Sequence, residues 1–372
     1  MRKINLLFII YDLDRGGPEM RLLDFARFFP QEIKINICVT SKSMALLNEF
    51  QKSDVDIKVL PIIKAYREKE KIYEIHDYIK KKRITVVNTF DIKGLMIAVF
   101  IKSFLNKKIK IIHHTVDLLH NYKIRHKASL WFLLKFVDLS ICNSSHSKNI
   151  LKGRFIGQHK IKVIYNGVDI EHYNQNNYKA SSFKKKHNID HDKIVLGTVA
   201  NFRKEKNYPF LLKAFADLDK KHNNLVLLCV GGGRELDEMK EYAKEIGIED
   251  KVIFTGYSED VADYLGIMDF FLLCSLKEGF PNGIIQAMSM GIPVIASAVG
   301  GCNEIINDQE TGMLFSPNNA LEFEKCVSRL ILDKDLSLRL GNNGQRNTRE
   351  RFSMKTMIQS YLKSFEEIDG KV

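Results

Sequence analysis

The chain has 372 residues, of which 45% are hydrophobic and 27% are charged. This balance excludes an intrinsically disordered chain, and the length favours two α/β domains over one. The net charge of +12 is segregated: residues 1–175 carry 31 Lys and Arg against 17 Asp and Glu (+14), whereas residues 176–372 carry 26 against 28 (−2). The N-terminal half is therefore expected to face something anionic. No nucleic-acid-binding module is recognised, so nucleic acid is not the expected partner.

The chain starts with a short apolar run, Ile4–Ile10, which Asp12 and Asp14 follow without a small-residue cleavage site. We interpret this run as a first β-strand rather than a secretory signal. No apolar run reaches the roughly 18 residues that a membrane span requires, so a cytoplasmic protein without a transmembrane anchor is expected. The cysteines have neither CxxC nor metal-ligand spacing, which favours buried, reduced thiols. They are Cys38, Cys142, Cys229, Cys274, Cys302 and Cys326.

Short apolar, β-branched runs alternate with segments of helix length along the whole chain, which indicates βαβ units and parallel sheets. The expected strands of the first half are INLLFII, INICVT, IKVLPI, ITVVNT, IKIIH, LSICN and IKVIYN. Those of the second half are IVLGTVA, NLVLLCV, KVIFTG, DFFLLCS and IPVIAS.

A polar stretch rich in Asn and Lys, residues 174–193, lies between the two sets of strands and lacks a strand pattern. It predicts a first Rossmann-like domain over residues 1–173 and a second over residues 174–350. Residues 351–372 then form a helix that is expected to pack back on the first domain. The apolar face of this helix has Met354, Met357, Ile358, Tyr361, Leu362 and Phe365.

Two features of the first half lie at the ends of expected strands. Gly16 and Gly17 follow the first strand and precede Pro18, which suits the first turn of a helix; glycines there would let a ligand approach the backbone closely. The GxGxxG dinucleotide pattern is absent. His113 and His114 end the strand IKIIH. A histidine in such a place is either a satisfied core residue or a group that faces a ligand, and both readings stay open.

The stretch NYKIRHKASLWFLLKFV, residues 121–137, combines four basic residues with the sole tryptophan, Trp131. An interfacial membrane-binding helix and a core helix with a basic outer face both fit this pattern.

The stretch TVANFRKEKNYPFLLKAF places Arg203, Lys204 and Lys206 after a strand, and Asn207 is expected to cap the next helix. Basic side chains at a strand's carboxyl end would neutralise a diphosphate, although a solvated basic loop gives the same pattern. The glycines of VGGGREL, Gly231–Gly233, are interpreted as a structural turn.

The stretch SLKEGFPNGIIQAMSMGIPVIAS, residues 275–297, joins a strand to an apolar helix that is expected to begin at Asn282 as its N-cap. The amides of Gly283 and the next two residues would then form an anion site at the helix N-terminus. Gln286 lies four residues after the cap and would reach a hydroxyl beside the anion, and Glu278 would accept hydrogen bonds from a polyol. A diphosphate, a ribose and a sugar would satisfy all three features, although a plain turn with a solvated carboxylate remains an alternative.

Together these motifs resemble those of the retaining nucleotide-sugar glycosyltransferases of family 4. The resemblance covers nearly the whole chain, and the order and spacing of the motifs carry it. The resemblance implies the α/β GT-B fold, with two Rossmann-like domains whose parallel sheets face each other across a cleft. The motifs are RGGPE, the strand-end His114, CNSSHSKNIL, KVIYNGVD, ANFRKEKN, VGGG, FTGY and, as the most specific, SLKEGFPNGIIQAMSMGIPVIAS.

The resemblance also implies roles for individual residues. Lys206 would pair with the donor pyrophosphate, and Arg203 would supply the charge of a family arginine whose position is Asn201 here. Glu278 would contact hydroxyls of the transferred sugar, and His114 would stabilise an oxocarbenium-like transition state, with His113 as the alternative. The remaining donor-binding residues would be Gly16, Gly17, Tyr257 at the base, Gly279, Phe280, Pro281, Asn282 and Gly283.

One departure from the family pattern concerns the second glutamate of the last motif, which is Gln286 here. In the family this glutamate binds the ribose hydroxyls. An amide oxygen still accepts a hydrogen bond, but the charge-assisted strength is lost, a difference of about 1 kcal/mol. Weaker donor binding is expected, and a non-catalytic relative remains an alternative.

The resemblance implies transfer of a hexosyl or N-acetylhexosaminyl group from a nucleotide sugar, UDP-linked as a family-level expectation, to a glycan or lipid-linked glycan. A second carboxylate for a double displacement is not evident, and the resemblance implies retention through same-face attack. The scattered Asp-x-Asp triplets look accidental, so no metal and no other cofactor are expected. The basic N-terminal domain would make peripheral contact with the cytoplasmic face of an anionic membrane. A nucleotide-sugar epimerase and a non-catalytic sugar-nucleotide-binding subunit are the rival functions.

Overall fold

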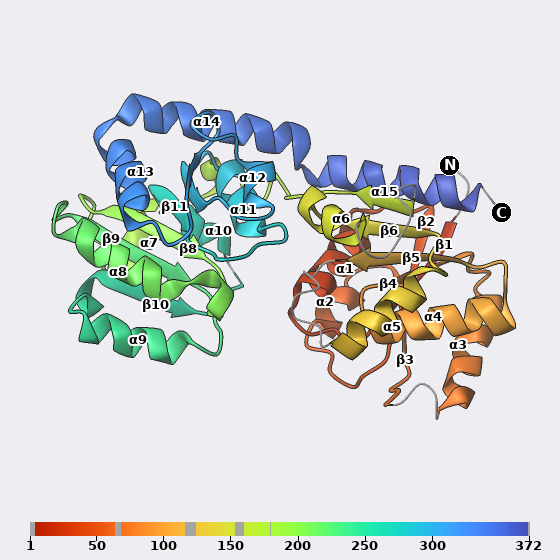
Figure 1. The fold of residues 1–372 in the computed structure, drawn as a ribbon. Helices are drawn as coiled ribbons and strands as arrows, with labels where there is room; N and C mark the ends of the chain where they lie inside the picture. Colours follow the sequence, from red (N-terminus) through yellow and green to blue (C-terminus); the bar gives the residue numbers. More distant parts are fainter. Residues whose placement is uncertain are drawn as a thin grey trace. The chain divides into compact units, whose positions relative to one another are not determined.

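The computed structural model describes residues 4–63, 68–115, 124–152, 160–178, 180–259 and 261–370, without the side chains of 124–127, 180–182 and 369. The chain divides into two compact units (Figure 1). The first contains Met1–Tyr165 and Met357–Val372, and the second contains Asn166–Thr356. The chain therefore crosses between units twice, and the expected boundary after residue 173 lies within the second unit.

The first unit contains a seven-stranded parallel sheet with the strand order β3-β2-β1-β4-β5-β6-β7. Its middle strands are nearly continuous apolar runs, as expected for a sheet that helices cover on both faces. The strands are β1 (Ile4–Ile10), β2 (Ile33–Val39), β3 (Val55–Val59), β4 (Val86–Thr89), β5 (Lys110–Thr115), β6 (Leu139–Cys142) and β7 (Ile161–Val163). The helices are α1 (Gly17–Phe28), α2 (Leu47–Gln51), α3 (Lys69–Lys81), α4 (Ile92–Phe100) with the π-turn η1 (Ile101–Leu105), α5 (Ile124–Leu134), α6 (Ser145–Lys152) and most of α15 (Met354–Asp369).

The C-terminal helix α15 packs on the first unit through its apolar face. The ring of Tyr361 lies 4.7 Å from that of Phe25 in α1, in an edge-to-face arrangement, and Phe365 contacts Phe29 in the same way at 5.8 Å. Such aromatic pairs add about 0.5–1.5 kcal/mol each beyond the area that they bury. The 3.6-residue spacing of its apolar side chains therefore gives α15 a buried stripe, as the sequence predicts.

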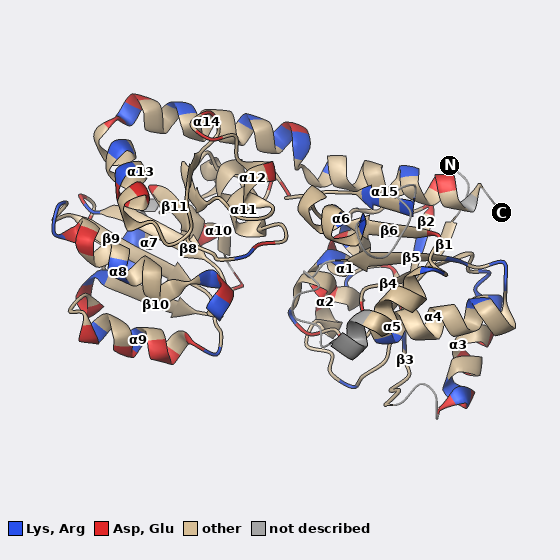
Figure 2. Ribbon diagram, in the orientation of Figure 1, with Lys and Arg blue, Asp and Glu red and all other residues tan. Residues whose placement is uncertain are grey.

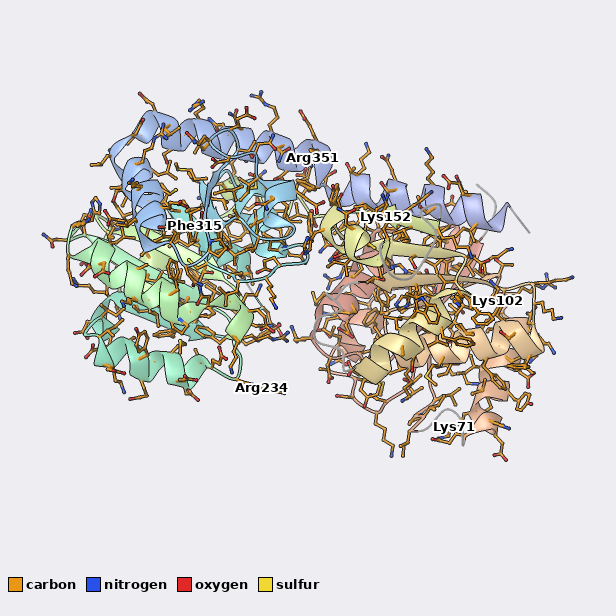
Figure 3. All side chains as sticks on the ribbon, viewed as in Figure 1. Lys71, Lys102, Lys152, Arg234, Phe315 and Arg351 are labelled. Carbon is orange, nitrogen blue, oxygen red and sulfur yellow. The ribbon has the colours of Figure 1, made fainter. Side chains whose placement is uncertain are left out.

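The second unit contains a six-stranded parallel sheet with the strand order β10-β9-β8-β11-β12-β13. A large apolar cluster fills its interior, and Phe315, which Figure 3 labels within this unit, is 2% exposed. The strands are β8 (Ile194–Val199), β9 (Leu225–Val230), β10 (Val252–Gly256), β11 (Phe270–Leu273), β12 (Val294–Ser297) and β13 (Met313–Phe315). The helices are α7 (Ala180–Lys186), the 3₁₀ turns η4 (Gln175–Asn177), η5 (Lys204–Lys206) and η6 (Glu249–Lys251), α8 (Tyr208–Asp219), α9 (Leu236–Glu245), α10 (Val261–Leu265), α11 (Asn282–Ser289), α12 (Cys302–Ile305), α13 (Ala320–Leu332) and α14 (Lys334–Arg351).

All twelve strands expected from the sequence are present, and both sheets are parallel. The thirteenth, β13, was not expected, because three residues are too few for a period to show. The six cysteines are buried and form no disulfide, as predicted. Within the described segments, the structure contains no helix that is long and apolar enough to cross a bilayer.

Candidate functional site

The loop after β8 carries the predicted basic residues and is held by a buried aromatic pair. Phe202 is fully buried, and its ring stacks on that of Tyr208 at 3.8 Å. The Tyr208 hydroxyl donates a hydrogen bond of 2.7 Å to the carbonyl of Ala200, which ties the start of α8 back to the loop. Asn207 is the N-cap residue of α8, as predicted, and has a left-handed backbone, but its side chain donates to Asn318 and makes no cap hydrogen bond.

The loop after β9 lies directly against the loop after β8. Gly231 and Gly233 both have positive φ, at 148° and 146°, and a Cβ on either would lie 2.2–2.4 Å from a backbone oxygen of the β8 loop. The amide of Phe202 donates to the carbonyl of Gly232 at 2.8 Å. These glycines thus permit a close backbone approach that any side chain would block. This placement supports the interpretation of VGGG as a structural turn.

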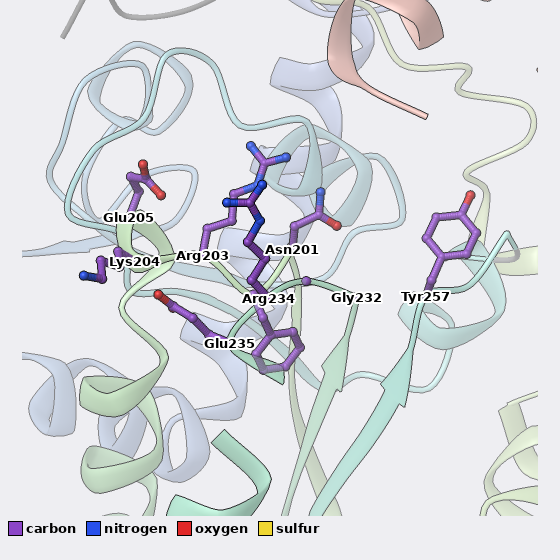
Figure 4. A pocket seen from close by; sticks show the side chains of 10 residues that line it. Asn201, Arg203, Lys204, Glu205, Gly232, Arg234, Glu235 and Tyr257 are labelled. Atoms are coloured by element: carbon purple, nitrogen blue, oxygen red, sulfur yellow. The ribbon is translucent and has the colours of Figure 1, made fainter. Parts of the chain in front are cut away.

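A cavity of about 770 Å³ opens at the carboxyl ends of β8, β9 and β10 (Figure 4). This volume lies within the range of ligand sites, roughly 300–1,000 Å³, and the carboxyl ends of parallel strands are where open α/β sheets bind ligands. Three of the residues that the sequence assigns to the donor site line this cavity, namely Asn201, Arg203 and Tyr257. The other lining residues are Phe202, Lys204, Glu205, Gly232, Gly233, Arg234 and Glu235.

Lys206 and Glu278 form an ion pair in which Nζ lies 2.6 Å from Oε1. The Glu278 side chain is 8% exposed and that of Lys206 is 23% exposed. The hydroxyl of Ser275 donates to the same carboxylate oxygen at 2.5 Å, and the Leu276 amide donates to the carbonyl of Glu205, next to the lysine. The two residues assigned to donor phosphate and sugar are therefore brought together, in a pair that water only partly reaches.

The N-terminus of α11 differs in detail from the sequence prediction. Asn282 is the first helical residue and Pro281 occupies the cap position, so the predicted Asn282 cap is wrong. The Asn282 Oδ1 instead accepts a hydrogen bond of 2.5 Å from Asn166. The amide of Ile284 donates to the carbonyl of Pro281. Among the described residues, the amides of Asn282 and Gly283 have no hydrogen-bond acceptor, so they differ from the predicted set only in part, and anion binding at this helix start stays a prediction.

The glycine turn before α11 is more buried than a ligand-lining loop would be. Phe280 is 7% exposed, and its ring packs edge-to-face on Phe352 at 5.5 Å. Pro281 is buried and Gly279 is half-buried. Phe280 therefore anchors the turn against the end of α14, and its role in donor binding stays a prediction.

Gln286 lies on α11 and donates a hydrogen bond of 2.8 Å from Nε2 to the hydroxyl of Tyr173. Ser289, on the next turn of the helix, donates to the carbonyl of the same tyrosine at 3.0 Å. The side-chain amide of Gln286 therefore has a partner within the protein, and its contact with ribose stays a prediction. Sequence reasoning missed Tyr173, because it lies more than a hundred residues away, at the end of the expected first domain.

Gly16 and Gly17 begin α1 in the first unit, where Gly16 is the N-cap. The carboxylate of Glu19 folds back over Gly16 and occupies the space where a Cβ would lie. Burial raises the pKa of Glu19 to about 7, and the nearby Asp12, Asp91 and Asp14 raise it further against the lowering effect of a backbone hydrogen bond. The space beside Gly16 that would let a ligand approach the backbone is therefore filled by the side chain of Glu19.

His114 lies in the core of the first unit, 2% exposed. Its Nε2 is 3.0 Å from the Asn88 Oδ1, and its ring stacks on Phe90 at 4.5 Å and on Tyr361 at 5.7 Å. Burial holds the pKa of His114 well below its usual value. A neutral, enclosed imidazole fits the reading of His114 as a core residue, and its contact with a donor stays a prediction. His113 is also buried, at 4% exposure.

No group of three or more His, Cys, Asp or Glu side chains in the described part of the chain is arranged to hold a metal ion. The expectation that the reaction needs no metal stays a prediction.

Comparison with known proteins assigns both halves of the chain to glycosyltransferases. Residues 15–172 match the family described as Glycosyltransferase Family 4, and residues 180–347 match Glycosyl transferases group 1. A relative of similar length is the capsular polysaccharide biosynthesis glycosyltransferase CapH of Staphylococcus aureus, which is 27% identical over 88% of this chain and 91% of its own.

Other matches cover less of the chain or show the fold alone. An Escherichia coli UDP-Gal:alpha-D-GlcNAc-diphosphoundecaprenol alpha-1,3-galactosyltransferase is 28% identical over 56% of this chain and 54% of its own, so this chain spans about half of its length, as it does for several other curated relatives. The crystal structure of Anabaena Alr3699/HepE in complex with UDP-glucose superposes with a TM-score of 0.86 at 19% identity, covering 98% of this chain and 100% of the other. The chain belongs to the family-4, group 1 glycosyltransferases and has the GT-B fold, with two parallel α/β sheets.

Proposed function

We propose that the protein transfers a hexosyl or N-acetylhexosaminyl group from a UDP-linked sugar to a glycan or lipid-linked glycan, in the synthesis of a cell-surface polysaccharide. The observation that carries this proposal is the ion pair between Lys206 and Glu278. Lys206 directly follows Glu205, which lines a cavity of ligand size. The functions of CapH and of the galactosyltransferase support the acceptor class, and the UDP-glucose in HepE supports the donor class.

Each part of the site has a role in this reaction. Lys206, Arg203 and the free amides at the start of α11 would neutralise the charge that develops on the leaving diphosphate. Glu278 accepts hydrogen bonds from sugar hydroxyls through its carboxylate, whose orientation the hydroxyl of Ser275 fixes. Retention at the anomeric carbon would follow from attack on the same face as the departing diphosphate. No step requires a metal, so we expect full activity in excess chelator.

The test measures transfer with a panel of UDP-sugars and glycan acceptors, and nuclear magnetic resonance reads the anomeric configuration of the product. Lys206→Ala and Glu278→Ala should each lower kcat/KM by at least a hundredfold, which corresponds to about 2.7 kcal/mol of lost transition-state stabilisation. Lys213→Ala and Glu238→Ala, exposed on the neighbouring helices α8 and α9, are matched controls. Full activity in both site variants would refute the proposal, as would a product of inverted configuration.

The substitution at Gln286 favours a second candidate, a subunit that binds a sugar nucleotide without transferring the sugar. Such a protein would bind UDP-sugars and show neither transfer nor hydrolysis with any acceptor. A nucleotide-sugar epimerase would instead convert the donor without an acceptor. Chromatography of the donor pool after incubation with and without acceptor separates these activities.

The outer face of α5 supports peripheral contact with an anionic bilayer. Trp131 and Phe132 are 42% and 55% exposed, and Phe136 just beyond the helix is 36% exposed. Figure 2 shows the described part of α5 mostly tan, with few charges. The ammonium of Lys135 lies 4.0 Å from the Trp131 ring. Aromatic side chains beside a lysine are typical of surfaces that insert at lipid headgroups. The described face is thus aromatic; the basic Lys123 lies outside the described residues.

Intrinsic fluorescence tests this contact, because Trp131 is the sole tryptophan. Vesicles that contain an anionic phospholipid should shift its emission to the blue, whereas vesicles of zwitterionic lipid should do so weakly. A Phe132→Ser variant should reduce co-sedimentation with vesicles, and Leu338→Ser, an exposed apolar residue of α14, is the control. An unchanged spectrum with both kinds of vesicle, or binding that high salt leaves unaffected, would refute electrostatic docking.

A further inference from the structure

Arg203 and Arg234 occupy matching positions in the two loops that meet at the cavity. Phe202 and Gly233 form an isolated parallel β-bridge. Arg203 and Arg234 follow these two residues and therefore occupy neighbouring positions on the two loops. The amide of Glu235 donates to the carbonyl of Phe202 at 3.4 Å, which continues the pairing past the bridge. Neighbouring strands lie about 4.8 Å apart, and Figure 4 shows both guanidinium groups among the side chains that line the cavity.

These two arginines bring like charges together without a counter-charge. Neither forms an ion pair or a side-chain hydrogen bond with any described residue. Glu205 and Glu235 line the same cavity, yet neither approaches an arginine within ion-pair distance. Like charges on directly paired positions destabilise a sheet. An anion bound between the two guanidinium groups would remove this repulsion.

The chemistry of the pair points to a phosphate ligand. A guanidinium group presents its N–H donors as a planar fork that matches two phosphate oxygens, whereas an ammonium acts as a point charge. The resemblance to the family places an arginine at position 201, where this chain has Asn201, and Asn201 lines the same cavity. We infer that Arg234 is a donor-binding residue that acts with Arg203 as a two-arginine clamp on the diphosphate of the nucleotide sugar. This inference rests on the proposed function and assigns a role to a loop that the sequence indicates only as a turn.

The test measures binding to the full-length protein by calorimetry, with UDP, UMP and inorganic pyrophosphate as probes. Arg234→Ala should lower the affinity for UDP and pyrophosphate about tenfold to a hundredfold, the range for a hydrogen bond to a charged group. Its effect on the affinity for UMP should be smaller. Arg234→Lys should restore part of the loss, because it keeps the charge but not the fork. Arg339→Ala, an exposed arginine of α14, is the matched control and should bind all three probes as the wild type does.

Three outcomes would overturn the inference. Unchanged binding of UDP and pyrophosphate by Arg234→Ala, while Lys206→Ala weakens both, would refute the clamp and leave the proposed function intact. Equal losses for UMP and UDP would place Arg234 at the nucleoside instead. If the wild type binds neither UDP nor pyrophosphate, both proposals fail. Conversely, loss of pyrophosphate binding in Arg234→Ala supports the clamp even if the wild type transfers no sugar.

Discussion

The Lys206–Glu278 pair allows a stability prediction that does not depend on the donor. Removing either partner leaves the other charge in a place that water only partly reaches, since the two side chains are 23% and 8% exposed. Glu278→Ala removes the ion-pair partner of the Lys206 ammonium. Lys206→Ala leaves the Glu278 carboxylate with a hydrogen bond from the hydroxyl of Ser275. We therefore expect Glu278→Ala to destabilise the second unit at least as much as Lys206→Ala does.

The size of the effect lies between two known limits. Exposed ion pairs contribute about 0.2–1 kcal/mol, and breaking a fully buried pair costs about 3–5 kcal/mol. With one partner buried and the other about a quarter exposed, each single variant should lose about 2 kcal/mol of unfolding free energy. The double variant Lys206→Ala/Glu278→Ala should lose about 1–2 kcal/mol less than the sum of the single variants, because neither charge is then left without its partner.

Differential scanning calorimetry on the intact chain measures this cycle. Two units need not unfold together, so the transition of the second unit is identified first from its response to the variants. A loss of 2 kcal/mol should lower its Tm by about 4–8 °C for a unit of this size. Additive losses, with a coupling free energy below about 0.5 kcal/mol, would show that the pair does not form in solution.

Three further predictions concern other parts of the molecule. Gln286→Glu should tighten UDP-sugar binding about fivefold, the value of about 1 kcal/mol for a charge-assisted hydrogen bond; calorimetry that shows no change would mean that this position does not contact the donor. Glu19 has a folded pKa of about 7 against an ordinary value of 4.5, so the folded state binds the proton more tightly and stability falls as pH rises from 4.5 to 7. Because Glu19 is partly exposed, we discount this loss to about 1 kcal/mol, and Glu19→Gln should flatten the Tm profile between pH 5 and 8; a parallel profile contradicts this cause. Gly231→Ala should destabilise the second unit by about 2–4 kcal/mol, because the added Cβ would lie 2.2 Å from the carbonyl oxygen of Ala200; an unchanged Tm would show that the loop relaxes freely.

The features predicted correctly from the sequence depend on short-range patterns. The apolar runs of the strands and the helical period of α15 repeat within a few residues, so their positions follow from the sequence alone. The sequence places both Lys206 and Glu278 after strands of one parallel sheet, whose carboxyl ends meet at one edge, but it did not predict the ion pair between them.

The contacts that the sequence did not reveal join residues that are distant in sequence. Gln286 donates a hydrogen bond to Tyr173, and no local pattern indicates that partner. His114 ends its strand as predicted, yet α15 places Tyr361 over its ring and completes its burial. A strand end indicates where a side chain lies along the sheet, but it does not show which later helix covers that side chain.

The candidate site differs from the family pattern in the placement of its charges. Relative to the family pattern, the chain lacks a carboxylate at Gln286 and an arginine at Asn201, and it carries the adjacent Arg203 and Arg234 at the cavity. The two arginines place positive charge on the paired loops after β8 and β9. The site therefore favours a ligand with two negative groups over a ligand with one. Because these arginines are exposed, salt screens their attraction for the phosphates of the ligand. Added salt should therefore lower the affinity for UDP more than the affinity for UMP. Equal salt dependence for both nucleotides would mean that the arginines do not act on the second phosphate.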